Sequence, residues 1–129
     1  MCACSSRDEV SRTTSPDDRV DALLFETNCG APCSFGYEVR LVAKGGHDGE
    51  EVAYLDGATR NAQAWGVNLK WLAADRLSVE YLRAENERLL KQTVGVGGRD
   101  IQIFLRSGVS DPLAPAGGML YNLNGRPMN

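Results

Sequence analysis

The sequence predicts an all-β fold with room for one short helix: a single antiparallel sheet, a meander, or a small sandwich or barrel of about six to eight strands. Two observations lead to this prediction. Apolar residues recur at every second position in one segment after another between residues 20 and 105, and turn-forming Gly, Pro and Asp residues separate these segments. The chain has 129 residues, of which 43% are hydrophobic and 24% charged, which is typical of one globular domain.

The first part of this region supplies most of the strand candidates. Residues 20–27 are apolar on both faces, which predicts a central strand. Residues 37–43 alternate apolar and polar side chains, as in a half-buried strand, and residues 52–55 form a shorter candidate. The clearest alternation spans residues 65–71, and a short link to residues 77–81 predicts an antiparallel hairpin. Four aromatic side chains on the inward phase are expected to pack in the core: Tyr37, Trp65, Trp71 and Tyr81.

Residues 83–92 admit two interpretations. They are mostly good helix formers, and Glu87 and Lys91 stand at the i,i+4 spacing that supports a helix. Their apolar residues do not form a continuous helical stripe. A strand over residues 88–96 would instead pair, through a Gly-Gly turn, with residues 101–105. We favour the strand for the second half of this segment and leave the first half open.

The two ends of the chain differ from its middle. Residues 1–17 are polar and show no hydrophobic periodicity, which predicts a flexible N-terminal tether ahead of a single β domain over residues 18–129. Near the other end, Met119, Tyr121 and Leu123 alternate with other residues and predict a last edge strand.

The longest predicted loops are the candidate recognition surface. They span residues 43–51, 56–64 and 107–118, the last of them rich in Gly and Pro. Loops held on a rigid sheet commonly carry binding sites, whereas aromatic residues on the inward phase of strands fill the core.

Composition excludes two classes of partner. The net charge is −3 and no Lys/Arg cluster occurs, which argues against a nucleic-acid-binding protein. No apolar run approaches the ~20 residues that a membrane-spanning helix needs. A protein partner is therefore expected, and the membrane enters only through a lipid anchor; the oligomeric state stays open.

The four cysteines are split between the start of the chain and one turn. Met1-Cys2, followed by a polar segment, looks like the start of a mature bacterial lipoprotein, in which the cysteine carries the lipid. Cys29 and Cys33 bracket a Gly/Pro turn and are candidates for a local disulfide in an oxidising compartment. Free, partly buried thiols are the alternative for this pair, and a cytosolic protein with a Cys-rich start is the alternative to the lipoprotein. The one-residue gap between Cys2 and Cys4 is too tight for a zinc knuckle.

No catalytic set, metal site or cofactor is predicted. His47 is the only histidine, and it lies with three carboxylates in a flexible hairpin loop that rarely fixes metal geometry. A catalytic pair of Cys29 or Cys33 with His47 as base would require the two loops to meet in space. Three glutamates, Glu26, Glu38 and Glu80, would serve as acid and base only if two of them came within reach of one another.

Three motifs together resemble a family of small, largely uncharacterised bacterial envelope proteins, many of them expected to be lipoproteins. Its motifs are Ser-Pro-Asp-Gly-Lys before the first strand, Glu-x-x-Cys-Gly-Ala after it, and later Trp-x5-Leu-x-Ile/Val-x-Tyr. Two departures matter: Asp18 replaces the turn glycine, and Cys33 is an additional thiol. The resemblance implies an antiparallel β fold and an envelope location, without an assigned reaction. It spans roughly residues 15 to 106, with the counterparts Ser15-Pro16-Asp17-Asp18-Arg19, Glu26-Thr27-Asn28-Cys29-Gly30-Ala31, and Trp71, Leu77, Val79 and Tyr81.

These observations favour a non-catalytic binding or inhibitory module of the bacterial cell envelope, periplasmic and anchored through lipid on Cys2. A neutraliser of a toxic enzyme, such as an immunity protein, fits its small size and acidic character. Two alternatives remain at this point: a thiol-dependent or hydrolytic enzyme using a loop cysteine with His47, and a cytoplasmic interaction protein without lipid.

Overall fold

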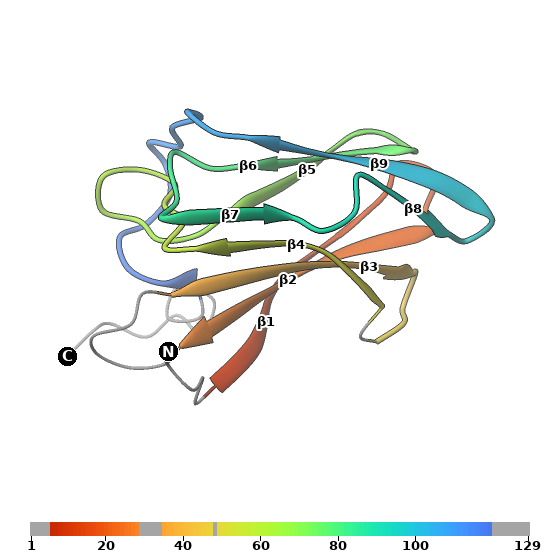
Figure 1. Ribbon diagram of the computed structural model, residues 1–129, viewed down its shortest axis with the longest axis horizontal. Coiled ribbons are helices and arrows are strands. Elements are labelled where there is room, and N and C mark those ends of the chain that lie inside the picture. Colours follow the sequence, from red (N-terminus) through yellow and green to blue (C-terminus); the bar gives the residue numbers. More distant parts are fainter. Residues whose placement is uncertain (1–5, 29–34, 48, 120–129) are drawn as a thin grey trace.

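The all-β prediction is confirmed: a computed structural model shows a β-sandwich (Figure 1). The structure describes residues 6–28, 35–47 and 49–119, and no helical element occurs in these ranges. The described ranges contain nine strands: β1 (Ser6–Thr14), β2 (Val20–Asn28), β3 (Gly36–Ala43), β4 (Glu50–Asp56), β5 (Asn68–Ala73), β6 (Arg76–Glu80), β7 (Asn86–Leu89), β8 (Thr93–Val96) and β9 (Arg99–Arg106).

The strands form two sheets that pack face to face. One has the order β1-β2-β3-β4-β7 and the other the order β5-β6-β9-β8. Neighbouring strands are antiparallel except β6 and β9, which are parallel. The β5–β6 hairpin and the pairing of β8 with β9 through Gly97-Gly98 both confirm the prediction. Both turn glycines have positive φ, as a two-residue hairpin turn requires.

The core lies between the sheets and is built from the inward phase of the central strands. Tyr37 and Tyr81 are almost completely buried, as predicted, whereas Trp65 and Trp71 are only half-buried at its margin. The residues of β2 show why a both-face apolar pattern marks a central strand: every position from Val20 to Thr27 is buried. The inward set includes Val20, Ala22, Leu24, Val39, Leu41, Leu55, Leu77, Val79, Ile101 and Ile103.

Charged side chains cover the outward face of β2, which is turned away from the second sheet. The Arg7 guanidinium stacks 4.0 Å from the centre of the Phe25 ring, and its Nε donates to Glu38 at 2.7 Å. Arg40 makes a second ion pair with Glu38. Burial would raise the pKa of Glu38, but these two guanidinium groups outweigh it and hold the pKa below its usual value.

The predicted tether over residues 1–17 is wrong for residues 6–14, which form β1. This strand is polar because it is an edge strand with one face in solvent, and Val10 is its single buried apolar residue. Pairing with β2 along nearly its whole length holds it in place, with an irregularity between Glu9 and Ser11. A polar edge strand gives no periodic hydrophobic signal, so composition alone resembled a tether.

The sandwich has two distinct ends. Tight connections at residues 15–19, 74–75 and 97–98, together with the β3–β4 connection, gather at what we call the turn end. Segments 57–67, 81–85 and 107–118 gather at the opposite loop end (Figure 1).

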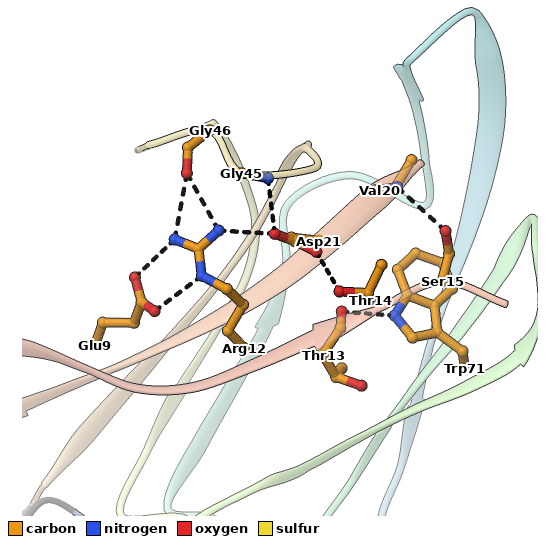
Figure 2. Close-up of polar contacts among 10 residues, drawn as sticks. All are labelled: Glu9, Arg12, Thr13, Thr14, Ser15, Val20, Asp21, Gly45, Gly46 and Trp71. Atoms are coloured by element: carbon orange, nitrogen blue, oxygen red, sulfur yellow. Dashed lines mark hydrogen bonds and ion pairs between the residues drawn. The ribbon is translucent and has the colours of Figure 1, made fainter. Parts of the chain in front are cut away.

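A polar network fixes the turn end (Figure 2). The buried Asp21 carboxylate accepts hydrogen bonds from Arg12 at 2.8 Å, from the Thr14 hydroxyl at 2.7 Å and from the Gly45 backbone N–H at 3.0 Å. Arg12 also donates to the carbonyl of Gly46 and to Glu9. The network therefore ties the β3–β4 hairpin to β1 and β2.

One long side of the sandwich is closed by a bond between the sheets. The indole Nε1 of Trp71, on β5, donates to the carbonyl of Thr13, on β1, at 2.9 Å (Figure 2). The opposite long side is formed by β7 and β8, and it is built differently.

Candidate functional site

The chain crosses from one sheet to the other between β7 and β8, and this crossing shapes the β7–β8 side of the sandwich. The single strand predicted over residues 88–96 is wrong: β7 pairs with β4 in one sheet, and β8 pairs with β9 in the other. The chain leaves the first sheet where the N–H groups of Leu90 and Lys91 both donate to the carbonyl of Val52. Neither edge is therefore covered along its full length.

The loop-end half of β9 is left without a neighbour on this side. The N–H of Gln102 donates to the carbonyl of Asp75, in the turn just before β6, and the carbonyl of Arg106 accepts from the N–H of Tyr81, just after β6. Even-numbered residues of β9 therefore bond toward β6. Odd-numbered residues bond toward β8, ending with Ile103, whose N–H donates to Gln92 at 2.9 Å. The N–H and C=O of Leu105 face the same open side, and within the described ranges no strand pairs with them.

A groove of about 450 Å³ runs along this open edge. Ile103 and Leu105 line its inner side and Phe104, which is 41% exposed, its outer side. Leu89 at the end of β7 forms the facing wall. The remaining lining residues are Gln92, Thr93 and Gln102. The groove thus joins an unpaired backbone edge to apolar walls.

The edge of β4 that β7 leaves uncovered is polar. It forms a wider hollow of about 690 Å³ beside β4, lined by both apolar and charged residues. Lys91 and Glu50 form an ion pair there, and Arg40 is engaged by Glu38. These charges already have partners within the chain, so the apolar groove along β9 is the stronger binding surface.

The loop end carries a third, smaller hollow of about 320 Å³. Its wall includes Trp65, whose ring packs edge-on against Phe35 with centroids 5.8 Å apart, and Arg83. Of the three predicted recognition loops, 56–64 and 107–118 meet here, whereas 43–51 lies at the turn end. Asn61 joins the first two by donating to the carbonyls of Asp111 and Ala114.

Beneath the loop end lies a buried polar group. The Tyr37 hydroxyl and the backbone N–H of Met119 both donate to the Glu26 carboxylate, at 2.6 and 2.7 Å. Burial, followed by the hydrogen bond to the Glu26 carboxylate and then its charge, raises the pKa of Tyr37 far above its usual value. Met119 is half-buried against the core, while the rest of the predicted last strand, Tyr121 and Leu123, lies outside the described residues.

Of the thiol–histidine pair considered as an alternative, the structure describes only His47. His47 is exposed on the β3–β4 connection at the turn end. Asn28 and Phe35, which flank the turn of Cys29 and Cys33, lie at the loop end, so the eight residues of β3 separate the two regions by about 26 Å. Cys2, Cys29 and Cys33 themselves lie outside the described residues, so lipidation and disulfide remain predictions.

The three glutamates are also kept apart. Glu26 points inward and Glu38 outward from the same sheet, because they stand opposite Tyr37 and Phe25 respectively. Glu80 belongs to the other sheet, where it bonds Ser78 and Arg106. Among the side chains that the structure describes, no group of three His, Cys, Asp or Glu residues could hold a metal ion.

Sequence reasoning missed the groove because it treated residues 88–96 as one strand. Two signals pointed to it. Phe104 is an aromatic residue on the outward phase of β9, between Ile103 and Leu105 on the inward phase. Leu89 and Leu90 are adjacent, so one of them must face solvent in any strand, and Leu90 is 48% exposed.

Comparison with known proteins gives no assignment. The chain matches no family model, and no curated protein or solved structure is similar to it at a significant level. The resemblance to envelope proteins therefore stays a prediction. A search of the described residues for a helix long and apolar enough to cross a bilayer found none.

Proposed function

We propose that this protein is a non-catalytic binding module of the bacterial cell envelope that captures an extended segment of a partner protein along the open edge of β9. The observation that carries the proposal is the backbone of Leu105 in an apolar groove: its N–H and C=O point away from β6 and meet no strand among the described residues. An edge strand with free N–H and C=O groups is complemented best by another strand, which supplies both donor and acceptor.

The groove also indicates what the bound segment looks like. Side chains of an added strand would alternate, one facing Leu89 and Leu105 between the sheets and the next lying beside Phe104 on the outer face. Each apolar side chain buried in this way contributes roughly 1.5–3 kcal/mol, and each backbone hydrogen bond about 0.5–1.5 kcal/mol. A segment with apolar residues at alternate positions is therefore the expected ligand, and inhibition would follow where that segment is needed by the partner.

Site-specific photo-crosslinking in the native host tests this proposal. A photoreactive phenylalanine placed at position 104 is expected to trap one partner in good yield. Position 72 is the matched control, because Leu72 is 48% exposed on the same sheet but lies on β5, away from the groove. Equal labelling from both positions, or no adduct from position 104, would contradict the proposal.

A proline at position 105 gives a second, independent readout. It removes an N–H that faces the groove, whereas a proline at position 104 would remove one that faces β6. Leu105→Pro is expected to abolish the adduct from position 104 while circular dichroism still shows a folded sheet. An adduct that survives in this folded variant would show that strand addition is not the binding mode.

Anchoring through lipid on Cys2 is the second part of the proposal. It is supported by Met1-Cys2 and the polar residues that follow. Mass spectrometry of the N-terminal peptide, from protein made in its host with the full-length gene, decides it. A diacylated or triacylated Cys2 is expected. An unmodified Cys2 still preceded by Met1 would instead favour a cytoplasmic interaction protein.

A further inference from the structure

The start of the folded domain lies very close to the proposed anchor. Because β1 begins at Ser6, only three residues lie between it and Cys2, so its first position is four residue steps along the chain from Cys2. Four residues span at most about 14 Å even when fully extended. A lipid on Cys2 would therefore hold the domain near the bilayer rather than on a long tether.

Strand pairing shows which end of the domain is held there. Ser6 stands opposite Asn28, and the neighbouring Thr27 stands opposite Gly36. Gly36 in turn pairs with Asp56, after which segment 57–67 begins. The start of β1 is thus at the loop end, while Thr13 is seven residues further along, about 23 Å toward the turn end (Figure 1).

The loop end presents side chains that suit a lipid headgroup layer. Leu113, between two prolines in segment 107–118, is 90% exposed, the highest exposure among the large apolar residues described. Trp65 is half-exposed at the same end, and Arg83 lies beside it. Tryptophan and arginine favour the boundary between headgroups and acyl chains, and a protruding leucine can enter it.

We propose that the loop end rests on the membrane surface, with Leu113 in the headgroup layer and the partner groove on β9 open to the side. This inference depends on the lipid anchor proposed above. The occupant of the loop end is thus a lipid surface, and two observations argue for it: the short segment between Cys2 and β1, and the exposed Leu113 at the same end of the domain.

The two tryptophans of the chain provide a direct test. Trp65 is at the loop end, and Trp71 is level with Thr13 through its hydrogen bond. Host-made, lipidated variants Trp71→Phe and Trp65→Phe, each with one tryptophan, are reconstituted into phosphatidylethanolamine–phosphatidylglycerol vesicles containing dansyl-labelled headgroups. Energy transfer to dansyl is expected to be several-fold more efficient from Trp65 than from Trp71.

The outcomes separate the orientation from the anchor. An unmodified Cys2 in the N-terminal peptide would overturn the anchor and this inference with it. A modified Cys2 with equal transfer from both tryptophans, or more from Trp71, would overturn the orientation alone. Leu113→Ser is expected to lower transfer from Trp65, whereas Leu72→Ser, on β5, leaves it unchanged; equal effects would show that Leu113 does not touch the lipid.

Discussion

Replacing Asp21 with Asn tests how the turn end is held together. The carboxylate is buried and accepts bonds from Arg12, Thr14 and Gly45 (Figure 2). Asn has nearly the same shape, and a flipped amide would accept from Arg12 and Gly45 while donating to the Thr14 hydroxyl. The substitution therefore removes the charge and leaves the geometry of the network in place.

The magnitude follows from what the charge contributes. Hydrogen bonds to an ionised group are worth about 1.5–3 kcal/mol, against about 0.5–1.5 kcal/mol for neutral ones. The bond to Arg12 accounts for most of the difference, although its side chain is 29% exposed and solvent weakens the pair. We expect Asp21→Asn to lower the free energy of unfolding by about 2 kcal/mol near neutral pH.

The pH dependence has a definite sign. Burial would raise the pKa of Asp21, but the bonds from Thr14, Gly45 and Arg12 outweigh it, so the pKa in the folded protein is below its usual value. The stabilisation is therefore present above the unfolded pKa near 4 and is lost as the pH falls through the folded pKa. Wild type and Asp21→Asn should differ most near neutral pH and converge in strong acid.

Urea unfolding followed by tryptophan fluorescence at about pH 7 and about pH 2 measures this difference. Asp18→Asn is the matched control, because Asp18 lies in the preceding turn, is 70% exposed, and bonds only the exposed Lys44. It should change the free energy of unfolding by less than about 0.5 kcal/mol. A loss of that size or smaller for Asp21→Asn, or a larger loss that persists unchanged in acid, would refute the reasoning.

Three further substitutions can be followed by the same unfolding assay. Trp71→Phe removes the hydrogen bond from the β5 indole to the carbonyl of Thr13 and should lower the free energy of unfolding by about 2 kcal/mol. An unchanged unfolding midpoint would mean that water replaces the indole donor without loss. Tyr37→Phe removes one hydrogen-bond donor from the buried Glu26 carboxylate and should also lower the free energy of unfolding by about 2 kcal/mol. An unchanged free energy would show that the other partners of this carboxylate satisfy it. Asp18→Gly should raise the free energy of unfolding by about 0.5 kcal/mol, because Asp18 has a positive φ of 65°; a decrease would show that the bond to Lys44 outweighs the backbone strain.

The central strands could be predicted because burial on both faces leaves a strong trace in the sequence. β2 is flanked by β1 and β3, and its outward Leu23 and Phe25 are buried beneath charged neighbours, so neither phase of the strand is polar. The turn before β2 could also be predicted, because Pro presets the backbone and Asp tolerates the left-handed conformation that Asp18 adopts.

The edges could not be predicted, for a different physical reason. The backbone hydrogen bonds that hold β1 are independent of side-chain type, so its polar residues gave no periodic signal. Residues 86–96 divide between the two sheets according to which sheet has a strand available for pairing at each position. That depends on the tertiary structure and leaves no trace in the local sequence. Leu89 packs against the core beside β4, whereas Val94 packs there beside β9.

That same division creates the site and sets how a partner reaches it. If residues 90–92 had continued β8 in the second sheet, they would have extended its pairing with β9 as far as Leu105, whose N–H and C=O meet no described strand on that side. Because β9 runs from the turn end to the loop end, the proposed orientation places its groove along the membrane normal, with the open half nearer the lipid. A segment emerging from the membrane, or a chain extended across the periplasmic face of an envelope protein, would then meet the edge of β9 side-on, the geometry that strand addition requires.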